Sequence, residues 1–372
     1  MKLSLHLVTY NGAKYLPYLF ESLRTQTFQD WEMIVVENGS SDETLQVAKK
    51  EVESLGRPHR LLVNTENKGF TGGHNQAFNL KAQTSSLPSR MEGSRLAPYV
   101  CLVNQDMMLA PDYLERLMEF MEGNPEAAAA QGALFRWNFG PSTGGEQSQT
   151  TSSGRLQAEF SEIIDSLGLR VSKSRHVSDW GSGQSYGKIA RGSDALAQVH
   201  PVEIFGVSGA LPLYRRQALE VIALGGEIFD EDFFSYKEDV DLAFRLRSAG
   251  WRAYLIPAAR AWHDRTVSGK LDRNIISLIR GRRGRSFLVA GWAYRNHLFT
   301  LIKNEYFANV WRDSARLFFY ELRKFAFLAL FTPRALFVIP LLLRLAPRML
   351  RKRVQIRRKR KIFAWEMRRW FI

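Results

Sequence analysis

Asp106 is the residue whose type and position point most directly to chemistry in this chain. It closes the segment Tyr99–Asp106, in which an apolar run is followed by Asn104 and Gln105. Such a run, with β-branched residues, is typical of a buried strand, and open α/β sheets place ligand-binding groups at the carboxyl ends of strands. A carboxylate there is a suitable ligand for a hard divalent cation that also holds phosphate oxygens. The alternative is an ordinary Asn/Asp turn after the strand.

Strand and helix patterns alternate along the chain up to about residue 135 and would position Asp106. The predicted strands are 3–8, 31–36, 60–63, 99–106 and 127–135, and the predicted helices are 15–23, 41–55, 69–80 and 111–121. This alternation indicates a parallel sheet covered by helices on both faces. The segment at about 138–200 is rich in Gly, Ser, Thr and Gln and is expected to be a long loop. A helix at 240–249 and a last strand at 251–256 follow it.

The composition favours a folded protein with an anionic partner. The 372 residues carry a formal net charge of +15, which implies nucleic acid, acidic lipid or a phosphorylated substrate. The single cysteine, Cys101, forms no intrachain disulfide, so nothing indicates an oxidising compartment. The alternating residues Met1–Thr9, followed by Asn11 and Gly12, predict a strand and a turn rather than a signal peptide.

The last hundred residues have the composition of a membrane-surface region. The apolar stretch Phe325–Leu343 is about long enough to span a bilayer, but Pro333, Arg334 and Pro340 interrupt it. Interfacial or re-entrant helices are therefore expected rather than a clean span. The basic cluster Arg351–Lys361 beside it suits the anionic lipid of the cytoplasmic leaflet. We expect a catalytic domain at 1–265 and a membrane-associated helical region at 266–372, at the cytoplasmic face of the cell membrane.

Several short motifs, taken in order and spacing from residue 2 to about 265, resemble glycosyltransferase family two. They are Thr9-Tyr10-Asn11, Glu37-Asn38-Gly39-Ser40-Ser41-Asp42, Asn67-Lys68-Gly69-Phe70, Asn104-Gln105-Asp106 and Lys237-Glu238-Asp239. Gly209-Ala210 before Arg215-Arg216, together with His263, resembles the subgroup of rhamnosyltransferases of bacterial cell-surface polysaccharides.

The resemblance implies a fold and a reaction. The fold is GT-A, a Rossmann-like α/β architecture with a mostly parallel central sheet flanked by helices, here with a C-terminal helical, membrane-associating extension. The reaction is metal-dependent inverting transfer of a sugar, such as rhamnose, from a nucleotide-diphosphate sugar. The acceptor is a hydroxyl group of a glycan or a lipid-linked saccharide.

The resemblance also assigns a donor site. Thr9, Asn11 and Glu37 are expected to recognise the base, and a carboxylate can accept the imide N–H of uracil or thymine, which implies a dTDP- or UDP-linked donor. Asp42 either contacts the nucleoside or caps its helix. The glycines of the 69–75 segment let the backbone approach the nucleotide, where a helix start offers N–H groups to anionic oxygens. The remaining expected donor contacts are Gly69, Phe70, Gly73, Asn75, Asn104 and Gln105.

Metal and catalytic roles follow from the same resemblance. Asp106 and His263 are expected to hold Mg²⁺ or Mn²⁺ that bridges the diphosphate, although a His after a strand can also be structural. Asn104 replaces the first acid of the family's Asp-x-Asp motif. Asp239 is the expected general base, and its alternative role is a first-turn carboxylate favoured by the helix dipole. Glu238 orients it or contacts the acceptor.

Gly209 and Ala210 are expected to contact the acceptor. Two other functions stay open. One is transfer directly to polyprenyl phosphate, and the other is binding of nucleic acid by a basic protein. Against the second, the basic residues concentrate beside the apolar stretch and no familiar nucleic-acid motif occurs, so no nucleic-acid partner is expected.

Overall fold

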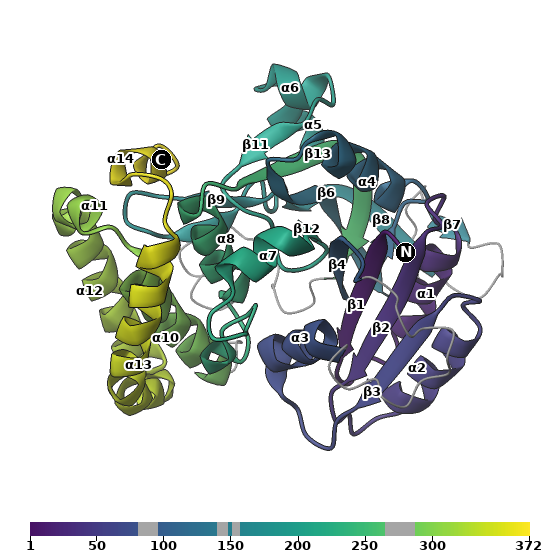
Figure 1. Cartoon of the computed structure of the whole chain (residues 1–372), viewed down its shortest axis with the longest axis horizontal. Helices are drawn as coiled ribbons and strands as arrows, with labels where there is room; N and C mark the ends of the chain where they lie inside the picture. The colour runs from purple at the N-terminus through teal and green to yellow at the C-terminus, as the bar shows by residue number, and fades with distance from the viewer. Residues whose placement is uncertain (81–95, 140–147, 151–156, 265–286) are drawn as a thin grey trace.

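The computed structural model describes residues 1–80, 96–139, 148–150, 157–264 and 287–372. Its centre is a mixed sheet with the strand order β11-β13-β6-β12-β4-β1-β2-β3 (Figure 1). These strands are β1 Leu3–Thr9, β2 Trp31–Glu37, β3 His59–Val63, β4 Tyr99–Asn104, β6 Ala127–Phe139, β11 Val202–Ile204, β12 Leu213–Arg215 and β13 Arg252–His263. The short β5, Met107–Leu109, pairs with the end of β13.

The part of the sheet formed by β3, β2, β1 and β4 is parallel, as predicted. Thr9 lies opposite Glu37 and Val8 opposite Asn104, so the polar residues that end these strands share one edge. The helices are α1 Leu16–Arg24, α2 Thr44–Glu53, α3 Gly69–Asn79 and α4 Tyr113–Gly123. α1, α2 and α4 pack on one face with Leu5, and α3 packs on the other with Ile34 and Val36. Both faces of the sheet are therefore covered.

β13 is longer than the predicted strand 251–256. It continues to His263, which the sequence had placed after the strand. The register against β6 shifts between Ile256 and Arg260, so the strand bulges where Pro257 cannot donate to the ladder. The bulge lets one strand run from the core to the candidate site.

The prediction of a long loop at about 138–200 is wrong for most of that segment. The structure forms β7 Ser148–Thr150, β8 Gln157–Ser166, β9 Leu169–Val171, β10 Val177–Asp179, α5 Tyr186–Ala190 and α6 Asp194–Ala197. β8 extends the sheet by pairing with β6. Its polar residues Asp165 and Ser166 are fully buried, which explains why the segment lacks the alternation expected of a strand. Residues 140–147 and 151–156 lie outside the described residues.

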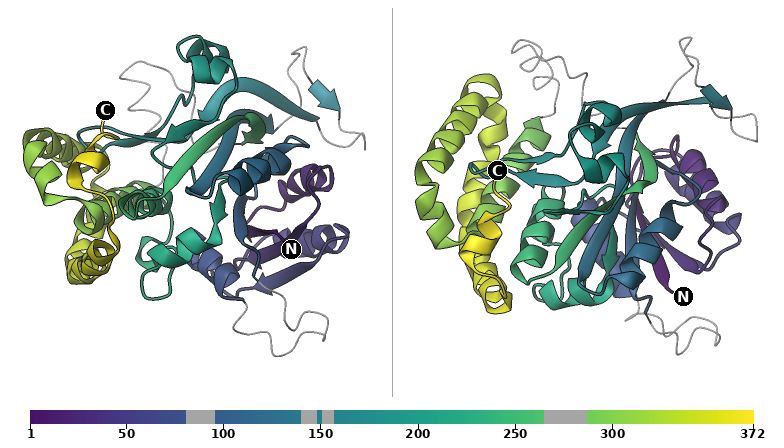
Figure 2. Two further views of the ribbon diagram at one scale, coloured as in Figure 1. Left: turned by 45° about the horizontal axis from the view of Figure 1, so that its top comes forward. Right: turned by 90° about the horizontal axis from the view of Figure 1, so that it is seen from above.

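The C-terminal helices lie together beside the sheet (Figures 1 and 2). They are α10 Phe287–Asn304, α11 Phe307–Arg312, α12 Ser314–Phe331, α13 Val338–Lys359 and α14 Ala364–Arg368, with a 3₁₀ turn at Pro333–Phe337. α10 contacts α8, Glu238–Ser248, and α13 contacts α7, Arg216–Ile222. The expected boundary at 265/266 falls outside the described residues.

In the described part of the chain, no single helix is both long and apolar enough to cross a membrane. One pair, Ser314–Phe331 and Pro333–Lys359, meets the length and composition limits together, but it is bent by 116°.

Candidate active site

The turn after β1 is held by Gln105. The Thr9 hydroxyl and the Tyr10 backbone N–H donate to Gln105 Oε1 at 2.7 and 3.0 Å. A Cβ on Gly12 would lie 2.2 Å from the same oxygen, so this position admits only glycine with Gln105 in place. Thr9 is fully buried. The structure therefore brings Thr9 and Gln105 together, and their contact with a nucleotide stays a prediction.

Glu37 and Asn11 shape the neighbouring loop after β2. The Glu37 carboxylate is almost fully buried and accepts the backbone N–H groups of Ser40 at 2.8 Å and Gly39 at 3.3 Å. Asn11, with φ of 48°, accepts the Ser41 N–H through Oδ1 at 2.9 Å. These contacts join the turns after β1 and β2 into one rim of the sheet. Base recognition by these two residues stays a prediction.

Asp42 is placed as a helix-capping residue. Its Oδ1 accepts the backbone N–H of Thr44, the first residue of α2, at 3.0 Å, and also the Thr44 hydroxyl. Burial favours the neutral acid, but the hydrogen bonds from Thr44 lower the pKa of Asp42 below its ordinary value. Of the two roles expected for Asp42, these contacts favour capping.

The glycines that begin α3 serve contacts within the protein. Gly69 has φ of 71°, and a Cβ there would lie 2.4 Å from the Phe234 carbonyl oxygen. A Cβ on Gly73 would lie 2.8 Å from Val8 Cγ1 on β1. Asn75 is buried; its amide donates to the Phe229 carbonyl at 2.8 Å and accepts the Phe229 N–H at 3.0 Å.

These contacts give the glycine-rich segment a packing role that the sequence did not indicate. Close packing of α3 against β1 and against the loop near Phe234 requires the small residues at 69 and 73. Contact of Gly69, Gly73 and Asn75 with a nucleotide stays a prediction. Phe70 packs edge-to-face on His74 and on Phe229.

Asp106 and His263 meet because β5 pairs with the end of β13. His263 lies opposite Met107, the residue after Asp106. The His263 Nε2 is 3.3 Å from Asp106 Oδ1, and its Nδ1 is 2.9 Å from Oδ2 of the buried Asp165 on β8. Burial disfavours the charged imidazole, but the two carboxylates outweigh it and raise the pKa of His263 to about 10.

Asp106 and His263 are suited to a divalent cation that is held partly by the phosphate oxygens of a bound nucleotide. Among the described residues, no group of three or more His, Cys, Asp and Glu side chains is arranged to bind a metal. Asp106 and His263, once the imidazole has lost its Nε2 proton, would supply two ligands, so phosphate oxygens and water would have to complete the coordination shell. The Asp165 contact at Nδ1 leaves Nε2 directed at Asp106, which is the usual carboxylate–histidine arrangement behind a metal ligand.

Two acids near this pair were missed from the sequence. Asp165 lies in the segment that was expected to be a loop, and no local signal marks it. Asp264 directly follows His263; its N–H donates to the Asp106 carbonyl at 3.1 Å, and it accepts the Tyr15 hydroxyl at 2.8 Å. The Trp137 indole also donates to the Asp106 carbonyl, at 3.0 Å. These bonds fix the backbone that carries the Asp106 carboxylate.

Asp239 lies in the first turn of α8, and Gly209 holds its carboxylate. The Gly209 N–H donates to Asp239 Oδ2 at 3.1 Å, and the Val240 N–H donates to Oδ1 at 2.7 Å. The next residue, Ala210, accepts the Asn104 N–H at 2.9 Å through its carbonyl. The segment 209–210 therefore links the acid of α8 to the end of β4. Its contact with an acceptor stays a prediction.

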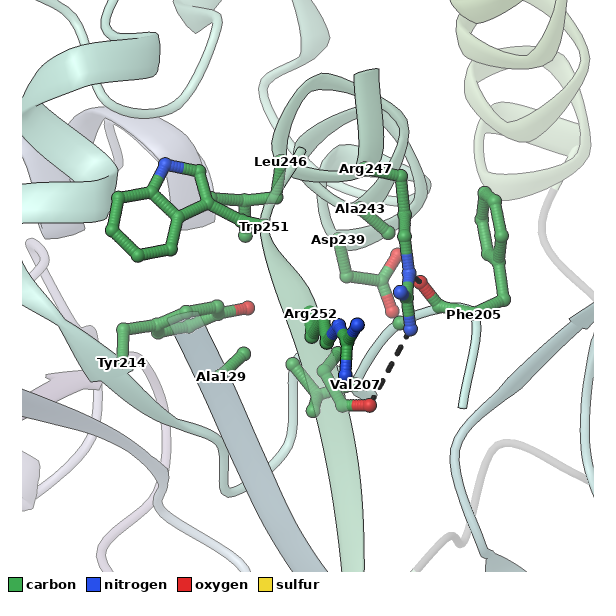
Figure 3. A pocket seen from close by; sticks show the side chains of 12 residues that line it. Ala129, Phe205, Val207, Tyr214, Asp239, Ala243, Leu246, Arg247, Trp251 and Arg252 are labelled. Carbon is green, nitrogen blue, oxygen red and sulfur yellow. Dashed lines mark hydrogen bonds between the residues drawn. The ribbon is translucent and has the colours of Figure 1, made fainter. Parts of the chain in front are cut away.

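The side of Asp239 that faces the sheet is closed. Figure 3 shows a pocket there, of about 10 Å³, lined among others by Tyr214, Leu246 and Trp251. It is too small for a sugar, so a substrate must reach Asp239 from the other side. Burial raises the pKa of Asp239, and burial together with the charge of Asp239 raises the pKa of Glu238 to about 8. Glu238 is therefore mostly protonated at neutral pH.

The loop before this pair has an unusual backbone that α10 stabilises. Phe234, Tyr236 and Lys237 have φ values of 62°, 73° and 69°, which side chains other than glycine rarely adopt. The Asn296 amide on α10 donates to the carbonyls of Phe233, Ser235 and Tyr236 at 2.9, 2.9 and 2.8 Å. From the other side, the Thr71 N–H of α3 donates to the Phe234 carbonyl at 3.2 Å.

A buried ion network anchors the same loop to the C-terminal helices. Lys303 of α10 contacts Asp230 at 2.5 Å and Asp241 of α8 at 2.9 Å. Lys352 of α13 also contacts Asp230, and it contacts Asp232 at 2.8 Å. Helices beyond residue 286 thus position the loop that precedes Glu238 and Asp239, a role that the sequence did not indicate.

Comparison with known proteins assigns a family to this architecture. Residues 4–222 match the model of glycosyl transferase family 2. The N-acetylglucosaminyl-diphospho-decaprenol L-rhamnosyltransferase of Mycobacterium tuberculosis is 24% identical over 265 residues, which are 71% of this chain and 76% of that protein. The glucosyl-dolichyl phosphate glucuronosyltransferase of Haloferax volcanii is 22% identical over 280 residues, 68% of this chain and 76% of that protein.

A solved structure supports the fold. The crystal structure of GalNAc-T7 with UDP, GalNAc and Mn²⁺ matches with a TM-score of 0.54 at 14% identity, over 81% of this chain. The match spans 48% of that chain, about half its length. The shared feature is a GT-A-like α/β fold with a mostly parallel sheet.

Proposed function

Because this chain belongs to glycosyl transferase family 2 and is a glycosyltransferase that uses a nucleotide sugar, we propose that it transfers rhamnose to a lipid-linked saccharide with inversion. The donor is a dTDP- or UDP-linked sugar. The observation that carries the proposal is the bridge from Asp239 through Gly209 and Ala210 to the β4 end. It holds the Asp239 carboxylate in place and connects it to the strand that ends at Asn104.

The acceptor class is supported by the relatives. The mycobacterial protein is named for a diphospho-decaprenol saccharide and the archaeal one for a dolichyl phosphate saccharide. Both names describe a sugar already attached to a phosphorylated polyisoprenoid. A lipid-linked saccharide is therefore the acceptor that we propose, and bare polyprenyl phosphate is the alternative to include in every assay.

The proposed mechanism divides the work between two groups of residues. Asp106 and His263 would hold a divalent cation, Mg²⁺ or Mn²⁺, which neutralises the negative charge of the donor diphosphate. Thr9, Asn11 and Glu37 lie on the rim that receives the nucleoside. Asp239 takes the proton of the acceptor hydroxyl as that oxygen attacks the anomeric carbon opposite the diphosphate.

We expect Asp106→Ala to abolish the thermal stabilisation that a nucleotide gives only in the presence of Mn²⁺. Asp106 supplies one of only two protein ligands, so its loss leaves the diphosphate charge uncompensated. The measurement is the melting temperature with dTDP, UDP and GDP and their sugars, each with and without Mn²⁺. Asp112→Ala, which removes an exposed carboxylate paired only with Arg116, is the matched control. Unchanged Mn²⁺-dependent stabilisation in Asp106→Ala would refute the metal assignment.

We also propose that α11 to α14 hold the enzyme on anionic membrane at the cytoplasmic face. Apolar side chains on these elements are more than half exposed, namely Phe307, Trp311, Phe318, Phe319, Leu330, Leu343, Phe363 and Trp365. Exposed arginines lie among them, including Arg312, Arg334, Arg344 and Arg351. Large exposed apolar side chains with interleaved cations suit a lipid interface.

Full-length protein is expected to float with phosphatidylglycerol vesicles and to do so less with phosphatidylcholine vesicles. Burial of an aromatic side chain in lipid stabilises membrane binding. The double variant Trp311→Ser with Phe318→Ser should therefore bind anionic vesicles more weakly, by about ten-fold or more. Val63→Ser, at an exposed site on β3, controls for a general change in solubility. Wild-type protein that stays in solution with anionic vesicles at low salt would refute the membrane proposal.

A further inference from the structure

An open groove of about 800 Å³ lies between the β9–β10 turn and one side of α12. Ser172, Lys173 and Ser174 line it from the turn, and Ile372 closes one part. The opposite wall consists of Arg316, Phe319, Tyr320, Leu322, Arg323 and Ala326 of α12. The spacing of three to four residues between most of these positions places them along one face of the helix.

A buried cluster fixes the two walls relative to each other. Arg175, in the turn, is almost fully buried and contacts Glu305 at 2.6 Å and Asp313 at 3.0 Å. Asp313 is the N-cap residue of α12. The His176 ring nitrogen also lies 3.0 Å from the Tyr320 hydroxyl across the groove. The groove is therefore preformed by the protein rather than left by two unconnected surfaces.

The groove combines cations with apolar surface. Lys173 and Arg323 make no ion pair with an acidic side chain in the part of the chain that the structure describes, and Arg316 approaches Asp313 only at 3.6 Å. Phe319 and Leu322 are 65% and 49% exposed, so apolar surface lies beside these cations. A ligand that pairs with these cations and also covers the apolar surface needs a strong negative charge joined to a hydrocarbon chain.

The β9–β10 hairpin connects this groove to the catalytic base. The Lys237 ammonium donates to the carbonyl of Val177 on β10 at 3.3 Å. Asp179, at the other end of β10, is close enough for its charge to contribute to the raised pKa of Asp239. From Ser174 to Asp179 the chain spans at most about 17 Å at strand rise. A phosphate bound at the turn is thus within reach of a small saccharide whose hydroxyl lies at Asp239.

We propose that the groove binds the diphosphate and the first isoprene units of a polyisoprenyl diphosphate acceptor. Lys173, Arg316 and Arg323 bind the phosphates, and Phe319, Leu322 and Ala326 contact the hydrocarbon. The saccharide then extends along the hairpin toward Asp239. This inference rests on the proposed function, because it names the site of the acceptor's lipid part.

The binding experiment uses full-length protein in detergent and farnesyl diphosphate as the probe, with farnesol and inorganic pyrophosphate as partial ligands. Titration calorimetry measures each affinity for the wild type and for Lys173→Glu with Arg323→Glu. Lys188→Glu with Arg191→Glu is the matched control, because it reverses two exposed charges that lie outside both the groove and the proposed membrane surface. Binding of dTDP or UDP with Mn²⁺ reports whether each variant is folded.

We expect farnesyl diphosphate to bind more tightly than either partial ligand. The groove variant should weaken it by about ten-fold or more, since each lost contact to a charged group is substantial, and the control by less than about two-fold. Equal weakening in both variants would mean general attraction to a basic surface and overturn the proposal. Equal affinity for pyrophosphate, or unchanged binding in a groove variant that still binds nucleotide, would overturn it too.

The outcome is separable from that of the proposed function. Groove-dependent binding of farnesyl diphosphate without sugar transfer to the lipid-linked saccharide would support the groove as a binding site and reject the proposed transfer reaction. If the groove variant transfers sugar to a lipid-linked saccharide as efficiently as the wild type, the proposed reaction stands and the groove site is rejected. In the expected case, the groove variant raises the acceptor KM for the lipid-linked saccharide and leaves transfer to a short soluble saccharide unchanged.

Discussion

Asp239→Asn is expected to lower sugar transfer by about 10²–10⁴-fold while nucleotide-sugar binding stays close to normal. The amide has nearly the same size, and its single oxygen can accept one of the two N–H groups, from Gly209 and Val240, that hold the carboxylate at 3.1 and 2.7 Å. It cannot take a proton from the acceptor. Donor affinity by calorimetry and transfer rate under saturating donor separate the two effects.

Glu238→Gln is the matched control for this variant. Since burial and the neighbouring charge raise the pKa of Glu238 to about 8, the wild-type side chain is already neutral at pH 7, and glutamine resembles it. We expect a loss well below that of Asp239→Asn. Because burial raises the pKa of Asp239, the acid limb of the rate profile should lie at a higher pH than an ordinary aspartate would give. Near-normal transfer by Asp239→Asn would refute the role of Asp239 as the general base. Lost donor binding would instead indicate that Asp239 contacts the donor.

Lys303→Ala is expected to reduce the free energy of unfolding by about 3–5 kcal/mol, the usual cost of removing one partner from a buried ion pair. Lys303 is fully buried and contacts both Asp230 and Asp241. Its loss removes one buried cation from both carboxylates and leaves Lys352 to balance Asp230 and Arg245 to balance Asp241. Urea denaturation followed by circular dichroism gives the change in unfolding free energy.

The pH dependence of that stability has a defined sign. Burial favours neutral Asp230, but Lys303 and Lys352 hold its pKa well below its ordinary value. The folded state therefore binds fewer protons than the unfolded chain, and this contribution is complete above about pH 4 and lost as the pH falls further. Lys2→Ala, which breaks an exposed pair with Glu122, should leave the urea midpoint unchanged. An equally small effect for Lys303→Ala would show that the network does not anchor the helices.

The parallel half of the sheet could be predicted because its signals are local. The apolar runs of β1, β2 and β4 each end in polar residues, and parallel strands bring such ends to one edge. Asp106, His263 and Asp239 were found through short motifs at strand and helix ends. The structure places the first two in contact at 3.3 Å, and it connects the third to β4 through the 209–210 segment.

What the sequence did not reveal depends on contacts between distant residues. Asp165 contacts His263 from β8, whose buried polar residues break the alternation expected of a strand. Asn296 stabilises the loop before Glu238 and lies 60 residues further along the chain. The packing of Gly69 against Phe234 and of Gly73 against Val8 was not foreseen either, because a local pattern does not show which distant residues occupy the space. Packing partners of this kind become visible only in the folded chain.

The most direct measurement is the anomeric configuration of the product that full-length protein forms from dTDP-rhamnose, Mn²⁺ and an N-acetylglucosaminyl diphosphate polyprenol. Nuclear magnetic resonance of the saccharide reports both transfer and stereochemistry, and parallel reactions with UDP-sugars and polyprenyl phosphate cover the alternatives. We expect one sugar to be added, with inverted configuration and only when Mn²⁺ or Mg²⁺ is present. Retained configuration, or no turnover of any nucleotide sugar by protein that binds nucleotide, would contradict the account.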